Sequence, residues 1–394
     1  MVNPLLSLDE ARRRLLAGAG TLGTERLPLD DALGRVLAEE VAAYRAQPPS
    51  ALSAMDGYAI RKADLPGPFK LVGEAPAGAP YEGALSQGET VRIFTGGVVP
   101  ASADKVVVQE IVREEDGQAT LTEEPSEASF IRPAGLDFGQ GDAVLKPGTL
   151  LTPAALALAA AANHAELCVT TKPRIAIVSS GDELVPPGGE PQPAEIIDAA
   201  SYGIAAFIRQ WGGEVTRRLH LRDDLAAVTE AARRLADEAD LIVTIGGASV
   251  GAKDLLRAAF QEAGAEERFA GIDVRPGKPF WHARAGRTLI AGLPGNPASA
   301  MVTARLLVAP LIGTLTGRGS HVFTESMRAP LAAALPPPGM RTTWHRAAMA
   351  EGELHIDPHG DSALLTPLAA ASCLVCQPGD TPLAEGTLAE ALPL

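Results

Sequence analysis

The sequence predicts a multidomain α/β protein whose largest part is a doubly wound, mainly parallel sheet. Three observations support this prediction. At 394 residues, of which 46% are hydrophobic, the chain is too long for a single core. Between residues 173 and 318, short apolar strands alternate with helical segments, which is the pattern of a parallel sheet. The flanking regions are instead rich in short strand-like runs that glycine and proline interrupt.

The first part of the chain predicts two helical segments that are separated by a β-rich insert. Ser7 and Glu10 form a capping box for the first helix. The second helix opens at Thr152-Pro153, where proline takes the first helical position. Residues 45–142 contain short strands, and Asp116-Gly117 predicts a hairpin between two of them. The β-rich part is therefore expected to interrupt a helical domain, which becomes discontinuous.

Five turns follow the predicted strands of the α/β part, and each carries glycine, a carboxylate or a basic residue. Ligands of open α/β sheets bind beyond the carboxyl ends of the strands, so these turns form the expected binding edge. We also expect Asp224 and Asn296 to cap the helices that follow them. The turns comprise residues 180–183, 222–224, 246–249, 276–279 and 293–297.

The carboxylates at this edge suit a hard cation. Mg²⁺ binds in proteins through one or two carboxylates together with ligand phosphates, and Asp182 and Glu183 are the candidates. A purely structural alternative stays open, in which Asp182 caps its turn and Glu183 is solvated. Asp254 either caps a helix or faces the cation.

Glycines and one lysine at the same edge suit a phosphorylated ligand. The small residues of 246–249 let backbone N–H groups approach a phosphate or a pterin-like ring. Lys278 lies between two prolines, and this stiff turn favours an anion-binding role, with Arg275 nearby. The residues of the 293–297 turn are typical of a helix N-terminus, and we expect the turn to form part of the wall of the ligand pocket.

A break at 336–339 precedes short strands that predict a small C-terminal β domain, including one over 363–368. Cys373 and Cys376 form an isolated C-x-x-C, which we interpret as core thiols because residues three apart on a strand point to opposite faces.

The overall composition excludes several classes of protein. A net charge of −14 without a dense basic patch argues against nucleic-acid binding. We find neither a secretion signal nor an apolar span of 18 residues, so the sequence predicts a cytoplasmic protein without membrane segments.

Seven motifs in order resemble the MoeA family of molybdopterin molybdenumtransferases, which also occurs as a domain of gephyrin and of plant Cnx1. The resemblance covers nearly the whole chain. One departure lies at 50–52, which reads Ser-Ala-Leu where the family usually has Phe-Asp-Asn or Phe-Asp-Arg. The motifs are Ser-Ala-Met-Asp-Gly-Tyr-Ala at 53–59 and the segments 95–110, 132–142, 180–184, 246–254, 276–279 and 293–297.

The resemblance implies four domains and an elongated homodimer. Each active site would be shared between the MogA-like α/β domain of one subunit and the β-rich domain of the other. The boundaries implied are 1–44 with 143–172 for the discontinuous helical domain, 45–142 for the β-rich domain, 173–318 for the α/β domain and 319–394 for the C-terminal β domain.

The reaction implied is insertion of molybdate into the dithiolene of adenylylated molybdopterin, with release of AMP that depends on Mg²⁺ or another divalent cation. Two rival functions are adenylylation of molybdopterin and a binding scaffold without turnover; a transient contact with a MogA-type adenylyltransferase is also expected. The resemblance implies catalytic roles for Asp56, Thr95, Asp137, Glu183 and Lys278; cation binding by Asp182, Glu183, Asp224 and Asp254; and ligand contacts from Ser180, Gly181, Gly246, Gly247, Ser249, Arg275, Pro294, Gly295, Asn296 and Pro297.

Overall fold

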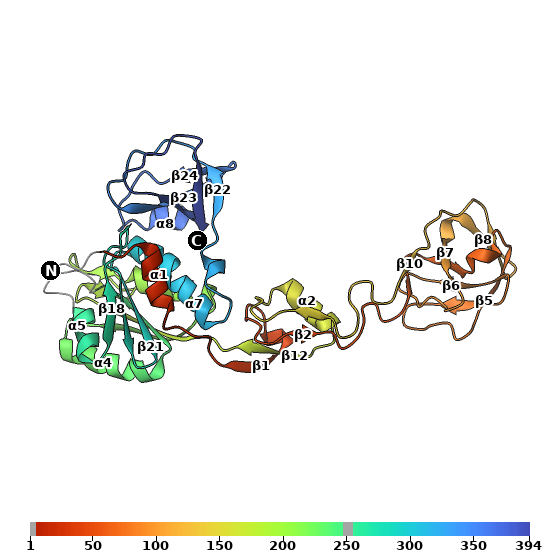
Figure 1. Cartoon of the computed structure of the whole chain (residues 1–394), viewed down its shortest axis with the longest axis horizontal. Helices are drawn as coiled ribbons and strands as arrows, with labels where there is room; N and C mark the ends of the chain where they lie inside the picture. The colour runs from red at the N-terminus through yellow and green to blue at the C-terminus, as the bar shows by residue number, and fades with distance from the viewer. Residues whose placement is uncertain (1–4, 247–254) are drawn as a thin grey trace. The chain divides into compact units, whose positions relative to one another are not determined.

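The computed structural model describes residues 5–246 and 255–394, which form two compact units (Figure 1). The first unit contains the N-terminal helix, the α/β part and the C-terminal β part. The second contains the β-rich insert. The four-domain division stays a prediction. The units comprise Met1–Glu25, Gly34–Ala38 and Val169–Leu394 in the first, and Arg26–Leu33 and Glu39–Cys168 in the second.

The first unit is built on a six-stranded sheet with the order β16-β13-β17-β21-β20-β18. The first four strands are parallel, β20 pairs antiparallel with β21, and β18 pairs antiparallel with β20, so the expected mainly parallel sheet is confirmed. A separate two-stranded parallel sheet is formed by β14 (Leu184–Val185) and β15 (Ile196–Ile197). The sheet strands are β13 (Arg174–Ser180), β16 (Glu214–Leu221), β17 (Leu241–Ile245), β18 (Glu266–Ala270), β20 (Trp281–Ala285) and β21 (Thr288–Leu293).

Helices cover both faces of this sheet because its strands are apolar on both sides. Ile175 and Ile177 of β13 pack into one core cluster, while Ala176 and Val178 pack into another. The first cluster includes residues of α1, α3, α6 and α7, and the second includes residues of α4 and α5. The helices are α1 (Leu8–Leu16), α3 (Ala199–Gln210), α4 (Leu225–Glu238), α5 (Leu255–Glu262), α6 (Pro297–Thr303) and α7 (Ala309–Leu315).

Helix α1 packs against the α/β core. Its N-cap is the predicted one, since Ser7 Oγ accepts a hydrogen bond from Glu10 N at 3.3 Å. Its apolar stripe is fully buried at Ala11 and Leu15, within the cluster that also contains residues of α7. The sequence shows that this apolar stripe must pack against other apolar residues. It does not show which ones, because the residues of α1 and α7 are far apart in the chain.

One helical run corrects the expectation that no long apolar span exists. Pro297–Leu315 is long and apolar enough to cross a membrane by composition, but 89% of its 18-residue apolar stretch is buried inside the protein. A π-helical segment, η4 (Ala304–Val308), interrupts it and carries the buried Arg305, whose side chain donates to Pro393 O and Phe323 O. Desolvation lowers the pKa of Arg305 to about 10.

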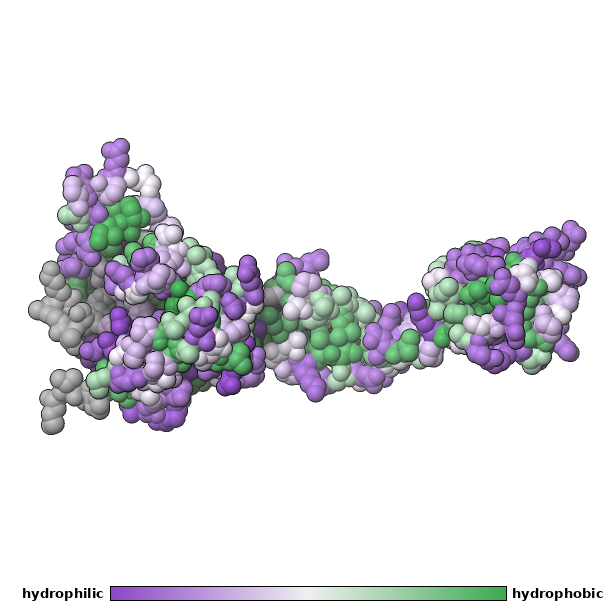
Figure 2. All heavy atoms as spheres, turned by 90° about the horizontal axis from the view of Figure 1, so that it is seen from above, coloured by the Kyte–Doolittle hydropathy of each residue, from purple (hydrophilic) through white to green (hydrophobic). Residues whose placement is uncertain are grey.

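On the face drawn in Figure 2, hydrophilic residues are spread over both units.

Gly292 is required by the indole ring that lies against it. A Cβ at this position on β21 would lie 1.8 Å from Trp281 Nε1, and Trp281 is itself 1% exposed. We expect Gly292→Ala to lower the free energy of unfolding by about 2–3 kcal/mol, because the buried ring must move. Urea unfolding measured by tryptophan fluorescence checks this. The control is Gly20→Ala, where the added Cβ meets nothing within 4 Å; equal losses in both variants would contradict the packing argument.

The C-terminal part forms a second sheet with the order β19-β23-β25-β26-β22, and β24 pairs with β23. Strands β23 and β24 pair antiparallel around Glu351-Gly352, and both of these residues have positive φ. The expected strand over 363–368 is wrong: the segment includes helix α8 (Thr366–Ala370), which Pro367 helps to start. The strands are β19 (Val274–Arg275), β22 (Met327–Pro330), β23 (Thr342–Ala350), β24 (Glu353–Ile356), β25 (Cys373–Gln377) and β26 (Leu388–Pro393).

The two C-terminal cysteines are free thiols in different environments of β25. Cys373 is buried in the core of the C-terminal sheet, and Cys376 packs against the α/β core. Burial raises the pKa of Cys376 to about 11 and also raises that of Cys373. Both thiols therefore stay protonated at neutral pH, as expected of packing residues rather than metal ligands.

The second unit contains a six-stranded sheet with the order β7-β4-β6-β5-β9-β8. The predicted hairpin is confirmed: β8 and β9 are joined through Asp116 (φ 50°) and Gly117 (φ 76°). The two ends of the insert meet where β2 pairs with β11, and β3 pairs with β10. The elements of the insert and its flanks are β1 (Thr24–Pro28), β2 (Val41–Ala42), β3 (Leu52–Ser53), β4 (Gly57–Ile60), β5 (Phe69–Ala75), β6 (Glu89–Ile93), β7 (Lys105–Val108), η3 (Gln109–Ile111), β8 (Val112–Glu115), β9 (Gln118–Leu121), β10 (Ile131–Arg132), β11 (Ala143–Leu145), α2 (Pro153–Ala161) and β12 (Glu166–Thr170).

Candidate active site

The described residues of the five predicted turns, which include only Gly246 of the 246–249 turn, lie at one edge of the α/β sheet. Four of them follow β13, β16, β17 and β21, the four neighbouring parallel strands, whose carboxyl ends share one edge. The fifth turn, 276–279, precedes β20. Since β20 is antiparallel to β21 and Trp281 pairs with Gly292, the start of β20 lies at the edge where β21 ends. The topology therefore brings the lysine turn to the same place as the glycine and carboxylate turns.

The turn after β13 exposes two carboxylates. Gly181 is buried with a φ of +147°, and a Cβ there would lie 2.7 Å from the Glu183 carboxylate. His220 Nε2 lies 2.9 Å from Gly181 O and fixes this turn to the neighbouring strand. Asp182 and Glu183 are both exposed. Because Gly181 leaves room for it, the Glu183 carboxylate folds back over the turn.

The turn after β16 contacts the turn after β13. Asp223 N donates to Asp182 Oδ1 at 3.3 Å. Asp224 caps helix α4 as predicted, because its Oδ1 accepts from Ala226 N at 2.9 Å and Ala227 N at 3.2 Å. Only one oxygen of Asp224 is used by the cap. Asp182 and Asp224 thus lie on two connected turns, each with a carboxylate oxygen that faces solvent.

Backbone atoms of three turns meet at the centre of this edge. Gly246 has a φ of +87°, and its N–H donates to Leu293 O at 3.1 Å. A Cβ on Gly246 would lie 3.5 Å from Ser180 O, and a Cβ on Gly295 would lie 3.4 Å from Gly246 Cα. Small residues therefore keep this centre open to a close backbone contact with a ligand. Gly247, Ser249 and Asp254 lie outside the described residues.

The turn after β21 contacts the C-terminal part of the chain. Pro297 begins helix α6 and Asn296 is its N-cap residue, as predicted, but the Asn296 side chain makes no capping hydrogen bond. Asn296 Nδ2 instead donates to Ser362 Oγ at 2.9 Å, and Ala298 N donates to Ser362 O at 3.1 Å. The Ser362 carbonyl thus accepts a hydrogen bond from the Ala298 N–H, which a capping side chain would otherwise bind. No local signal in the sequence indicates this contact. Pro294 is buried beside Gly295, and Pro297 is half-buried.

The lysine turn is held by its backbone, so its side chain is free to point outward. Gly277 is buried with a φ of +123°, and a Cβ there would lie 2.3 Å from Thr303 Cγ2. Lys278 O accepts from Ile272 N at 3.0 Å, and Phe280 N donates to Gly277 O at 3.1 Å. Lys278 is exposed and, within residues 5–246 and 255–394, forms no ion pair. The geometry suits a single ammonium group presented to an anion.

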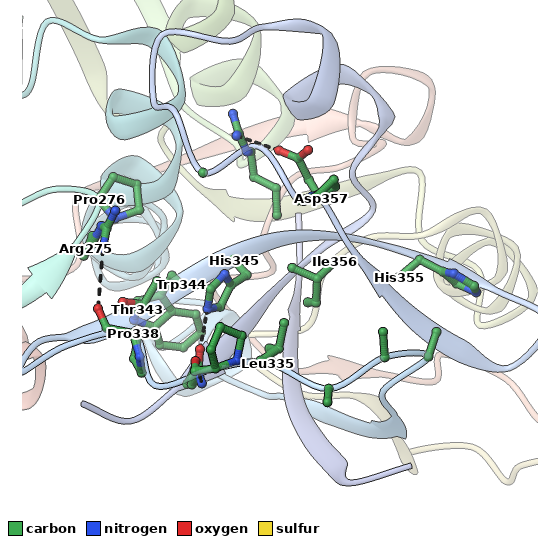
Figure 3. Close-up of a pocket in the computed structure, with 18 of the residues that line it drawn as sticks. Arg275, Pro276, Leu335, Pro338, Thr343, Trp344, His345, His355, Ile356 and Asp357 are labelled. Carbon is green, nitrogen blue, oxygen red and sulfur yellow. Dashed lines mark hydrogen bonds and ion pairs between the residues drawn. The ribbon is translucent and has the colours of Figure 1, made fainter. Parts of the chain in front are cut away.

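A cavity of about 740 Å³ opens beside this turn (Figure 3). Arg275 lines it from β19, which pairs with β23 and so joins the two sheets of the first unit. Arg346 and Ser362, which the sequence reasoning missed, also line it. Arg346 is 7% exposed and pairs with Asp357 at 2.7 Å. Two arginines thus line the cavity, and the guanidinium of one of them is already balanced by a carboxylate.

Two predicted residues of the second unit lie in direct contact. Asp56 Oδ1 accepts from Thr95 N at 2.7 Å and from Thr95 Oγ1 at 2.8 Å. These bonds, together with the charge of Arg92, hold the pKa of Asp56 below its usual value, so the carboxylate stays ionised. Asp137 lies on another segment, where its N–H donates to Gln47 O at 2.9 Å. Among the described residues no hydrogen bond joins it to Asp56 or Thr95.

The unusual 50–52 segment is fixed to the Thr95 turn through backbone bonds. Val99 N donates to Ala51 O at 2.9 Å, Ser53 N donates to Gly97 O at 2.9 Å, and Gly96 N donates to Ser53 O at 2.9 Å. These contacts require no particular side chain at 50–52. The missing aromatic and acidic residues therefore leave the backbone frame of Asp56 and Thr95 in place.

The carboxylates suit a divalent cation by type but do not form a closed cage. In the part of the chain that the structure describes, no group of three histidine, cysteine or acidic side chains is arranged to hold a metal ion. Asp182 and Asp224 each offer a hard oxygen donor, which is what Mg²⁺ uses when phosphate and water complete its shell. The residues fit a cation that arrives together with a phosphorylated ligand.

Comparisons with protein families cover most of the chain. Residues 6–163 match the model described as MoeA N-terminal region (domain I and II), and residues 328–394 match MoeA C-terminal region (domain IV). Residues 176–314 match the model of a probable molybdopterin binding domain.

Individual relatives agree with these matches. A molybdopterin molybdenumtransferase of Haemophilus influenzae is 36% identical over 80% of this chain and 78% of its own length. A relative of the same name from Synechococcus elongatus is 32% identical over 98% of this chain and 99% of its own length. A crystal structure of the molybdopterin biosynthesis MoeA protein from Pyrococcus horikoshii aligns with a TM-score of 0.83 at 27% identity over 99% of both chains. The chain therefore belongs to the MoeA family of molybdopterin molybdenumtransferases.

Proposed function

We propose that this enzyme of molybdenum cofactor biosynthesis inserts molybdate into the dithiolene of adenylylated molybdopterin and releases AMP in a step that depends on a divalent cation. The observation that carries the proposal is the gathering of glycine, carboxylate and lysine turns at one sheet edge. Such an edge is where open α/β sheets bind their ligands. The backbone N–H groups of the glycine turns can bind the pterin and its phosphates, and the ammonium group of the lysine can bind an oxyanion.

The basic residues of the first unit provide the anion side of the site. Lys278 is exposed at the sheet edge, and Arg275 lines the adjoining cavity. Molybdate is a small oxyanion, and ammonium and guanidinium groups bind such anions through charge-assisted hydrogen bonds. Ser362 adds a hydroxyl at the same cavity. We propose that the incoming molybdate binds between Lys278 and this cavity, close to the glycine turns at the sheet edge.

The carboxylates provide the cation side of the site. A cation bound by Asp182, Asp224 and phosphate oxygens would offset the negative charge that develops as AMP leaves. Glu183 lies on the same turn as Asp182 and completes the acidic face, to which the family resemblance adds Asp254. An acidic face also disfavours anions that arrive without a cation. Mg²⁺ is the cation that we propose.

Asp182→Asn is expected to raise the Mg²⁺ concentration needed for half-maximal AMP release by about tenfold, because it removes one anionic ligand. Asp224→Asn should act in the same direction while keeping helix α4 capped, since asparagine is also a good N-cap. Mg²⁺ titrations of AMP release check both variants. Asp237→Asn, on an exposed position of α4, is the control. An unchanged Mg²⁺ response in both site variants would show that these carboxylates do not bind the cation.

The β-rich unit is proposed to contribute from the partner subunit of a homodimer. Support comes from Asp56 and Thr95, which hold an ionised carboxylate at the surface of this unit, and from the family to which the chain belongs. Asp137 is proposed to act from the same unit. A transient contact with a MogA-type adenylyltransferase would supply the adenylylated substrate, and we propose a cytoplasmic location for both.

AMP release by the purified protein tests the proposal. The assay supplies adenylylated molybdopterin with molybdate and Mg²⁺, with each alone, and with neither. Release that requires both supports the transferase. Tight binding of the pterin without release would indicate the scaffold function. Formation of adenylylated pterin from molybdopterin and ATP would indicate the adenylyltransferase.

A further inference from the structure

Three segments of the β-rich unit end at one edge of its sheet. Strand β4 is antiparallel to both β6 and β7, and Gly57 at its start pairs with Ile93 and with Val108. The residue before β4 and the residues after β6 and β7 therefore lie side by side. Asp56 precedes β4, Thr95 follows β6, and Gln109 follows β7.

Arg92 contacts the segments around this edge. It lies on β6 directly opposite Tyr58 of β4. Its Nη1 donates to Tyr58 Oη at 2.7 Å, and its Nη2 donates to the side-chain oxygen of Gln109. The guanidinium carbon lies 4.9 Å from the centre of the Tyr58 ring and 5.6 Å from that of Phe94. One planar group thus joins residues from all three segments.

The same segments are also joined through Asp56. Gln109 N donates to Asp56 O at 3.1 Å, while the Asp56 carboxylate accepts the two bonds from Thr95. Arg92 therefore binds the side chain of Gln109, whose backbone N–H binds the backbone of Asp56. Arg92 also lies on β6, three residues before Thr95, which binds the Asp56 carboxylate. We propose that Arg92 is a positioning residue that fixes the turn carrying Asp56 against the turn carrying Thr95. Its consequence for turnover rests on the proposed function.

Arginine is suited to this position by both shape and charge. A planar guanidinium can donate to Tyr58 and Gln109 at fixed angles, which an ammonium group cannot reproduce. Within the described residues Arg92 forms no direct ion pair, because Glu114 is reached only through Tyr58 Oη, which donates to it at 2.7 Å. The charge of Arg92 adds to the two Thr95 bonds in lowering the pKa of Asp56. The charged groups around this arrangement are Asp56, Glu114 and Glu74, which lies opposite Arg92 on strand β5.

NMR titration of the full-length protein tests the proposal without any substrate. Aspartate is labelled at the carboxyl carbon, and the Asp56 signal is identified by its loss in Asp56→Asn. We expect Arg92→Gln to raise the pKa of Asp56, and Arg92→Lys to give an intermediate value because it restores charge but not geometry. Arg113→Gln is the matched control: it removes an exposed arginine from strand β8 of the same sheet, where it pairs only loosely with Glu115 at 3.9 Å.

Kinetics of AMP release provide the second readout. Arg92→Gln should lower kcat by about 10–100-fold with little change in KM for the pterin, since it disturbs orientation rather than binding. Arg92→Lys should recover part of this loss, and Arg113→Gln should match the wild type. If Arg92→Gln does not fold, Gln109→Met removes one partner of Arg92 and should raise the pKa of Asp56 in the same direction.

An Asp56 titration that is unchanged in Arg92→Gln, or that shifts equally in Arg113→Gln, would overturn the proposal. An altered titration with unchanged kcat would overturn its role in turnover. If the wild-type protein releases no AMP at all, the proposed function fails, and the titration still decides whether Arg92 positions Asp56.

Discussion

Lys278→Ala is expected to lower kcat/KM for AMP release by about 10²–10³-fold, which corresponds to the loss of one preorganised charge at a reacting anion. The side chain is exposed at the edge where four parallel strands end. The melting temperature should stay within about 1 °C of the wild-type value, since exposed side chains contribute little to stability.

The separation of activity from stability follows from how the turn is built. Backbone bonds from Ile272 and Phe280 and the packing of Gly277 against Thr303 hold it, and none of these involves the lysine side chain. Lys278→Arg should recover only part of the activity, because it keeps the charge but not the geometry. Lys172→Ala, at another exposed lysine of the same unit, is the control. A large fall in melting temperature with intact kcat/KM would show that Lys278 is structural.

Mixing Asp56→Ala subunits with Lys278→Ala subunits is expected to restore activity that neither variant shows alone. If each site takes Lys278 from one subunit and Asp56 from its partner, every mixed dimer contains one intact site and one doubly altered site. Random mixing makes half of the dimers mixed, so about a quarter of the wild-type activity should return. The measurement is AMP release after the two variants are unfolded and refolded together.

Two controls make the mixing experiment decisive. Each variant refolded alone reports its residual activity, and a mixture of the wild type with the double variant reports how freely subunits exchange. If both residues act within one subunit, no mixed dimer has an intact site, and activity stays at the level of the single variants. Sedimentation of the wild-type protein as a monomer would contradict the homodimer directly.

Local features of the chain are predictable because their causes lie within a few residues. The capping bonds of Ser7 and Asp224 and the positive φ at Asp116-Gly117 occur where the sequence places them. The alternation of strands and helices predicts a parallel sheet, and topology then gathers the turns at one edge.

The missed features depend on contacts between distant segments. Helix α1 is buried in a cluster that includes residues of α7, near the end of the α/β part. Asn296 bonds to Ser362, and β19 pairs with β23, across long stretches of chain. Arg346 looks like an ordinary strand residue until its carboxylate partner Asp357 and the cavity are in place. Propensity and spacing contain no information about such pairings.

The measurement that tests the central claim most directly is the amount of molybdenum retained in the pterin product for each AMP released. Adenylylated molybdopterin is incubated with the protein, molybdate and Mg²⁺, the pterin is separated, and molybdenum and AMP are quantified in the same sample. Insertion coupled to loss of AMP predicts a ratio of about one and no AMP without molybdate. AMP released without molybdenum in the pterin would show simple hydrolysis and would contradict the transferase.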